Sequence, residues 1–145
     1  MTDTKINKNY EHVKSIADGL DEIANGYIYK CPECGEWVEV SDIKSDTEHG
    51  LEICPECGEV MTYDDFELVT MWDYFDEVYN IKYVMDSDKE LESVKLMVAC
   101  GGPNIWVDTD SGTVELYWWG DRATAYLSTD AIEQINELGK ELFYC

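Results

Sequence analysis

Cys31-Pro32-Glu33-Cys34-Gly35 and Cys54-Pro55-Glu56-Cys57-Gly58 are two identical stretches, with 19 residues between Cys34 and Cys54, and they decide how the middle of the chain folds. A Cys-x-x-Cys turn brings two sulfur atoms to one ion. The glycine that follows lets backbone N–H groups turn toward the sulfurs without a clash from a Cβ atom. Four thiolates complete a tetrahedral shell and leave no position for water or substrate. We therefore predict a structural metal site, with the ligands Cys31, Cys34, Cys54 and Cys57.

Short strands are expected beside each cysteine turn, at 27–30, 36–40, 51–53 and 60–63, with a polar loop from 41 to 50 between the two halves. Cysteine turns set between short strands resemble the zinc ribbons and rubredoxin-like modules, and the resemblance covers residues 27–63. Relatives of such modules serve in transcription factors and ribosomal proteins, or only brace a fold. Zinc prefers a shell of four thiolates, so we predict structural zinc, with iron or a disulfide pair as the alternatives.

The chain is strongly acidic, with 32 acidic and 10 basic residues and a net charge of −22. No lysine or arginine occurs from residue 45 to residue 81, and glutamates stand at positions 33, 36, 56 and 59 beside the cysteines. Such a surface repels phosphate backbones and anionic membranes. We therefore expect no direct binding of nucleic acid or membrane. The charge favours a basic partner about as strongly as the plainer explanation, which is that it keeps the protein in solution.

The remaining segments predict an α+β protein. Helical spacing of apolar residues predicts helices at 9–25, at 66–79 and from about 129, the last capped by Thr129 or Asp130. Alternation predicts strands at 81–85, 94–99, 105–108 and 113–119. We expect a small antiparallel sheet of about four strands with flanking helices and an inserted four-cysteine zinc ribbon. The predicted domains are 1–26 (N-terminal helix), 27–63 (zinc ribbon) and 64–145 (helix, antiparallel meander and C-terminal helix).

No catalytic group can be assembled from the sequence. Cys100 begins a Gly-Gly-Pro turn, but a nucleophilic cysteine needs a base or a positive environment. The two histidines, His12 and His49, fall on a predicted helix and in an acidic loop. A small buried thiol at the end of a strand is the simpler interpretation of Cys100. Cys145 has no assignable role, and we predict that the protein is not an enzyme.

Aromatic residues near the end of the last predicted strand form a second candidate surface. Alternation sends Val114, Leu116 and Trp118 to one face and Glu115, Tyr117 and Trp119 to the other. Tyrosine, tryptophan and arginine are enriched where proteins bind one another, and Arg122 follows closely. The alternatives are that both faces are covered, or that Asp121 and Arg122 only form an ion pair in a turn.

The segments Leu96–Thr109 and Tyr117–Arg122 look like parts of small uncharacterised proteins of phages and mobile elements. That resemblance implies a mobile-element origin. Small acidic proteins of such elements often inhibit host defence nucleases, including CRISPR effectors and restriction enzymes. Together with cysteines that are predicted to bind metal rather than form disulfides, it places the protein in the cytoplasm of a bacterial host.

These observations lead to two predicted functions. The first is a non-enzymatic acidic inhibitor, anti-CRISPR or anti-restriction, which mimics nucleic acid and binds a basic nucleic-acid-binding protein. The second is a zinc-ribbon adaptor in transcription or assembly that binds through Trp118 and Trp119, and an enzyme that uses Cys100 ranks last. The predicted partner-binding residues are Asp64, Asp65, Asp73, Asp76, Glu77, Trp119 and Arg122.

Overall fold

The computed structural model describes residues 2–46 and 48–144, without the side chains of residues 2–7 and 63, so Cys145 lies outside the described residues. The chain is α+β and forms two compact units. We call Met1–Asp21 together with Met71–Cys145 the sheet unit, and Glu22–Thr70 the ribbon unit. The ribbon unit is therefore an insertion in the sheet unit.

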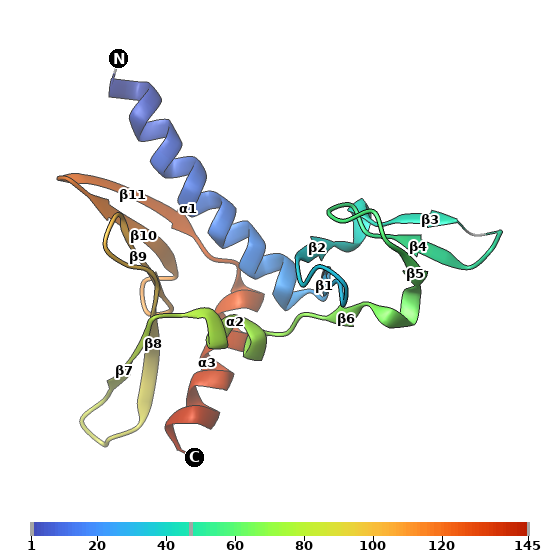
Figure 1. The fold of residues 1–145 in the computed structure, drawn as a ribbon. Helices are drawn as coiled ribbons and strands as arrows, with labels where there is room; N and C mark the ends of the chain where they lie inside the picture. Colours follow the sequence, from blue (N-terminus) through green and yellow to red (C-terminus); the bar gives the residue numbers. More distant parts are fainter. Residues whose placement is uncertain (1, 47, 145) are drawn as a thin grey trace. The chain divides into compact units, whose positions relative to one another are not determined.

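Five antiparallel strands form the sheet of the sheet unit, in the order β11-β10-β9-β8-β7 (Figure 1). Each strand pairs with the next one along the chain, so the sheet is a simple meander. The expectation of about four strands was one strand short. The strands are β7 (Asn80–Met85), β8 (Leu91–Ala99), β9 (Asn104–Asp108), β10 (Thr113–Trp118) and β11 (Asp121–Tyr126).

The fifth strand, β11, follows a two-residue turn. Trp119 and Gly120 both have positive φ, at 48° and 81°, and Trp118 pairs with Asp121 across the turn. Two positive φ values match the twist of a hairpin and return the chain directly along β10. The inward residues of β11 are Ala123 and Ala125, both buried. Alanine is depleted in strands, which is why alternation alone did not predict this one.

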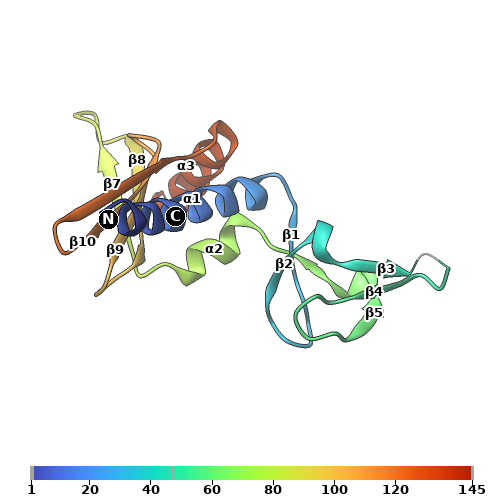
Figure 2. The ribbon, with the colours of Figure 1, turned by 90° about the horizontal axis from the view of Figure 1, so that it is seen from above.

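One face of the sheet is the core of the unit. Figures 1 and 2 show α1 (Thr2–Ala24) and α3 (Thr129–Phe143) on the same side of the sheet. The Ser128 side chain accepts a 3.2 Å hydrogen bond from the N–H of Ala131 and begins α3, so the predicted caps at Thr129 and Asp130 were wrong by one or two positions. The inward side chains of the sheet are fully buried: Val94, Leu96, Ile105, Val107, Val114 and Leu116.

Two helix predictions need correction. Helix α1 begins at Thr2 rather than near residue 9, because an apolar stripe marks only the part of a helix that packs, while the backbone hydrogen bonds continue beyond it. The helix predicted at 66–79 is only α2 (Met71–Glu77), which contacts α3 and has Met71 and Phe75 buried. Leu68, Trp72 and Tyr79 have the helical spacing behind that prediction, and all three are exposed.

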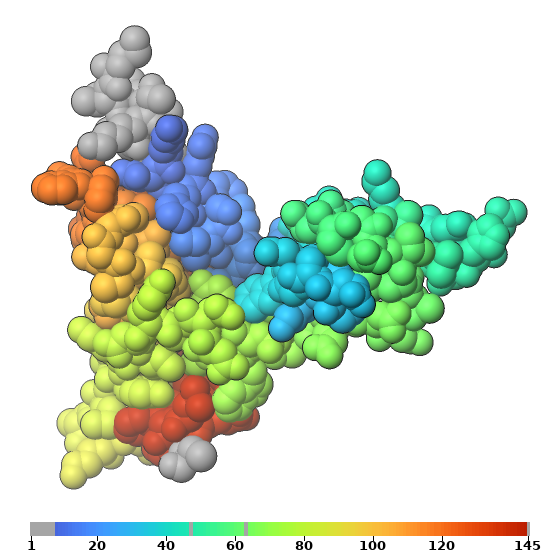
Figure 3. Space-filling view, in the orientation of Figure 1, coloured from blue at the N-terminus to red at the C-terminus, as the bar shows by residue number. Residues whose placement is uncertain are grey.

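The ribbon unit contains two three-stranded antiparallel sheets, in the orders β2-β1-β6 and β3-β4-β5. The loop predicted at 41–50 includes strand β3, and β6 occupies part of the predicted second helix. Tyr29 of β1 pairs with Leu68 of β6, so the chain leaves the unit beside the strand by which it entered. The strands are β1 (Ile28–Lys30), β2 (Trp37–Glu39), β3 (Lys44–Asp46), β4 (Leu51–Ile53), β5 (Val60–Thr62) and β6 (Glu67–Leu68). In Figure 3 the turquoise atoms of the β3–β4 hairpin project from the rest of the ribbon unit.

None of the helices within the described residues has the length and apolar character required to cross a lipid bilayer.

Candidate metal centre

The two cysteine turns fold identically. One joins β1 to β2 and the other joins β4 to β5. In the first, the N–H of Cys31 donates to the carbonyl of Glu36 (3.0 Å) and the N–H of Gly35 donates to the carbonyl of Cys31 (2.8 Å). Cys54 and its neighbours repeat both bonds at 3.1 and 3.0 Å. Gly35 and Gly58 have φ of 75° and 73°, a conformation that favours glycine.

The four predicted ligands come together. Their sulfur atoms all lie within 4.8 Å of one another, and two pairs across the turns, Cys31–Cys57 and Cys34–Cys54, lie at 3.8 Å. A tetrahedral shell with metal–sulfur bonds of about 2.3 Å has sulfur–sulfur edges of about 3.8 Å. Disulfide-bonded sulfurs would be about 2.05 Å apart, and all four cysteines are free. The arrangement therefore fits one tetrahedral metal ion.

The backbone around the sulfurs also suits thiolate ligands. Burial raises the pKa of the Cys54 thiol, but hydrogen bonds from the N–H groups of Cys57 and Glu56, together with those to the Cys57 and Cys31 side chains, outweigh it and bring that pKa to about 7. The N–H of Glu59 lowers the pKa of Cys57, yet desolvation and the sulfurs of Cys54 and Cys31 raise it to about 12. Neighbouring thiolates thus oppose one another. A bound cation removes this conflict, because it holds all four as thiolates at once.

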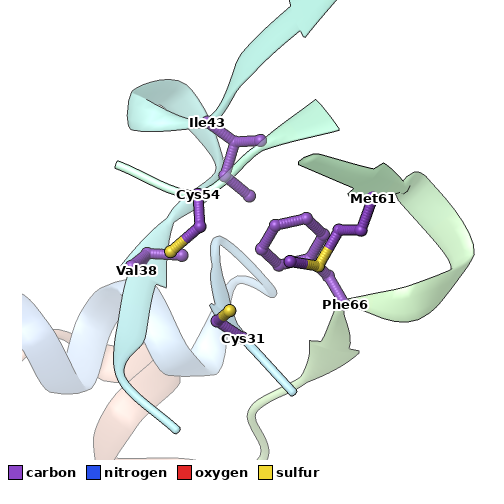
Figure 4. Close-up of a cluster of buried hydrophobic side chains, with 6 residues drawn as sticks. All are labelled: Cys31, Val38, Ile43, Cys54, Met61 and Phe66. Atoms are coloured by element: carbon purple, nitrogen blue, oxygen red, sulfur yellow. The ribbon is translucent and has the colours of Figure 1, made fainter. Parts of the chain in front are cut away.

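A small apolar cluster supports the inner side of the centre. Cys31 and Cys54 are almost fully buried, whereas Cys34 and Cys57 are exposed. In Figure 4 the Phe66 ring lies beside Met61, across the cluster from Val38. Phe66 falls within the helix predicted at 66–79, so its role beside the cysteines was not predicted. The available signal was that Phe66 falls off the apolar face of the predicted helix. The cluster consists of Cys31, Val38, Ile43, Cys54, Met61 and Phe66.

Exposed carboxylates surround the centre. The glutamates that flank the cysteines, at positions 33, 36, 56 and 59, are all exposed. The ribbon unit contains 13 acidic and 2 basic residues, a net charge of −11 on 49 of the 145 residues. Half of the chain's net charge of −22 therefore lies on one third of its length.

The predicted acidic partner-binding residues lie in both units. Asp64 and Asp65 are in a short 3₁₀ turn of the ribbon unit, Tyr63–Asp65, and both are exposed. The Asp65 carboxylate accepts hydrogen bonds of 3.0 Å from the backbone N–H and the hydroxyl of Thr62, so it also holds the end of β5. Helix α2 of the sheet unit carries Asp73, Asp76 and Glu77, which are exposed too.

The predicted aromatic residues lie at the end of the β10–β11 hairpin. Trp119 occupies the turn and is 82% exposed, and its ring meets that of Trp118 edge-on at 5.6 Å between centroids. Trp118 is only half-buried and packs on Gly102, where a Cβ would lie 2.5 Å from the indole. Arg122 pairs with Glu115 at 2.7 Å, across β10 and β11. The prediction that Trp118 belongs to the inner face with Leu116 was therefore only partly right.

The other candidates for chemistry, Cys100 and the two histidines, are exposed. Cys100 is exposed, so the prediction that its thiol is buried was wrong: β8 ends at Ala99 and the turn carries the thiol outward. Both histidines lie at the surface. His49 shares a 2.9 Å contact with Asp46 and lies near Glu48, a common arrangement of exposed acidic groups.

No protein-family model matches the chain, and neither does any curated protein or solved structure. The similarity of Leu96–Thr109 and Tyr117–Arg122 to proteins of phages and mobile elements is thus not supported by a family match.

Proposed function

We propose that the protein is a non-enzymatic, zinc-stabilised binding protein whose acidic surface occupies the nucleic-acid-binding site of a basic partner. The observation that carries this proposal is the concentration of exposed carboxylates on the ribbon unit. Zinc is the proposed ion because a closed shell of four thiolates suits it. Zinc bound to four thiolates adds about two further negative charges at the same place.

The proposed mechanism is competition. A channel that binds nucleic acid uses lysine and arginine to replace the counterions of phosphates. Carboxylates spaced over the ribbon unit can pair with the same side chains, and opposite charges speed the encounter at low salt. The sequence resemblance to proteins of mobile elements is the reason for proposing a bacterial defence nuclease, such as a CRISPR effector or restriction enzyme, as the partner.

Neutralising charges on the ribbon unit is expected to weaken binding most. The variant Glu56→Gln, Glu59→Gln, Asp64→Asn removes three exposed carboxylates, and it spares Asp65, which accepts a hydrogen bond from the backbone N–H of Thr62. We expect affinity for a purified CRISPR effector or restriction enzyme to fall at least tenfold, since such pairs contribute up to about 1 kcal/mol each. Titrations at low and high salt measure the affinity and its salt dependence.

Two matched triple variants locate the surface. Neutralising Asp73, Asp76 and Glu77 tests α2, and neutralising the exposed Glu133, Glu137 and Glu141 tests α3, with the same change of three charges. The ribbon variant should lose the most affinity and the α3 variant the least. Equal losses of affinity in all three triple variants would mean that only the total charge matters. Binding that does not depend on salt would contradict mimicry.

A second candidate function is supported by the backbone of Trp119. The first position of a turn with two positive φ values favours asparagine, aspartate or glycine, and a bulky residue there is strained. The chain nevertheless holds an almost fully exposed tryptophan at φ 48°. An adaptor that binds its partner through the tip of the β10–β11 hairpin would explain why that strained tryptophan is present.

Replacing Trp119 separates this adaptor from the acidic inhibitor. Trp119→Asn relieves the backbone strain of the turn, so the free energy of unfolding should stay the same or rise by up to about 1 kcal/mol. If the hairpin tip binds the partner, Trp119→Asn no longer captures that partner in a pull-down, at low and at high salt alike. Unchanged capture would eliminate the adaptor and leave the acidic surface as the binding site. Tyr126→Asn, at another highly exposed aromatic of the same hairpin, is the matched control.

A further inference from the structure

The outer face of the five-stranded sheet contains a hollow that neither proposed function uses. In Figures 1 and 2, α1 and α3 cover the opposite face. The hollow has a volume of about 280 Å³ and is formed by β7, β8, β9 and β10. Its lining residues are Lys82, Lys95, Trp106, Asp108, Glu115 and Tyr117.

Two lysines lie directly opposite each other at this hollow. Lys82 of β7 and Lys95 of β8 are paired in register, and like charges in that position destabilise a sheet. Lys95 has Asp108 at 3.5 Å, whereas the Lys82 ammonium lies 4.9 Å above the centre of the Trp106 ring. With Arg122, three of the chain's ten basic residues gather on this face. Lys82, Lys95 and Arg122 against Asp108 and Glu115 leave one net positive charge here, on a chain whose net charge is −22, and the pairing of the two lysines has a cost in stability.

The rest of the lining is already held in place. Glu115 accepts hydrogen bonds from Arg122 at 2.7 Å and from the Tyr117 hydroxyl at 2.8 Å. The Arg122 guanidinium also lies 5.5 Å from the centre of the Tyr117 ring. The charge of Glu115 is thus compensated within the wall of the hollow. Lys82 is the lining cation whose contact in the structure is an aromatic ring rather than a carboxylate.

We propose that the hollow binds a planar aromatic anion, with its acidic group between Lys82 and Lys95 and its ring on Trp106. The acidic group draws the Lys82 ammonium from the indole into a charge-assisted hydrogen bond, which is stronger than an exposed cation–π contact. The volume lies just below the usual range for small-molecule sites, which is about 300–1,000 Å³, so it suits one ring system with one acidic group. The site is independent of the proposed partner binding.

Titration by NMR at low salt tests the site, using the indole N–H signals of the five tryptophans. Trp106→Phe assigns the Trp106 signal by its disappearance. The probes are adenosine monophosphate and benzoate as aromatic anions with a phosphate or a carboxylate, adenosine as a ring without an anion, and inorganic phosphate as an anion without a ring. We expect at least one aromatic anion to shift the Trp106 signal in a saturable manner, and to bind at least tenfold more tightly than adenosine or phosphate. Which of the two binds distinguishes a phosphate from a carboxylate ligand.

Lys82→Met is the decisive variant, because it separates binding from structure. It removes the repulsion with Lys95, so the melting temperature should stay the same or rise, while binding weakens at least tenfold. Lys140→Met removes one charge from the exposed side of α3 and should change neither the Trp106 shifts nor the affinity. The proposal is overturned if neither aromatic anion binds, if phosphate alone binds as tightly, or if Lys82→Met binds normally.

Discussion

Loss of the metal is expected to unfold the ribbon unit while the sheet unit stays folded. The ribbon unit has 49 residues and one small apolar cluster, and units of this size usually need a metal or disulfides to fold. Structural zinc contributes about 10–16 kcal/mol of binding free energy in comparable peptides, far more than such a cluster can replace. Cys54→Ser should therefore abolish metal binding and protection of the ribbon strands from hydrogen exchange.

Metal analysis and hydrogen exchange measured by mass spectrometry check this result. We expect one zinc ion per chain in the unmodified protein and no iron, which would colour the protein. Amides of β8 to β10 should exchange equally slowly in Cys54→Ser and in the parent. Cys100→Ser is the matched control, since Cys100 is exposed and outside the ribbon unit, and it should keep both metal and protection. Persistent protection of β1 to β5 without metal would show that zinc is not structural here.

Truncation of Ile135 is expected to destabilise the sheet unit and leave the metal in the ribbon unit. Ile135 is fully buried on α3, and removing such a side chain leaves a cavity that costs about 2–5 kcal/mol. Gly139, one turn further along α3, lies so close to Val94 that a Cβ would clash, so the helix and sheet are already in tight contact. Ile135→Ala should therefore lower the stability of the sheet unit by a large share of its total.

Chemical denaturation followed by circular dichroism measures the loss of unfolding free energy in Ile135→Ala. Metal analysis of this variant should still find one zinc per chain. Glu133→Ala, on the exposed side of the same helix, changes a side chain of similar length without creating a cavity. Its stability should stay within about 0.5 kcal/mol of the parent. Comparable losses in both variants would mean that helix formation, rather than packing of α3 on the sheet, determines the stability of this unit.

The sequence predicted best where the information is local. The cysteine turns need only four thiols and two glycines at fixed spacing, and the structure brings all four sulfurs together. Strands β7 to β10 were predicted because large β-branched and aromatic residues alternate along them. Both signals are contained in a few neighbouring residues.

The errors occurred where distant contacts override local pattern. Leu68 continues the helical spacing of residues 71–79, but it pairs with Tyr29 of β1, and Phe66 is buried in the cluster beside the cysteines. The pairing of Lys82 with Lys95 could not be predicted either, because register depends on where the β7–β8 turn falls. The grouping of the outer-face residues around a hollow appears only once the sheet is assembled.

The pairing of β1 with β6 has a consequence for how this chain could have been built. The polypeptide enters and leaves the ribbon unit along neighbouring antiparallel strands, so the two ends of the unit are adjacent. A segment with adjacent ends can be gained, lost or exchanged as a cassette without opening a long gap in its host, as in tolerated domain insertions. The four-cysteine unit can therefore change between related proteins while the meander and its helices remain.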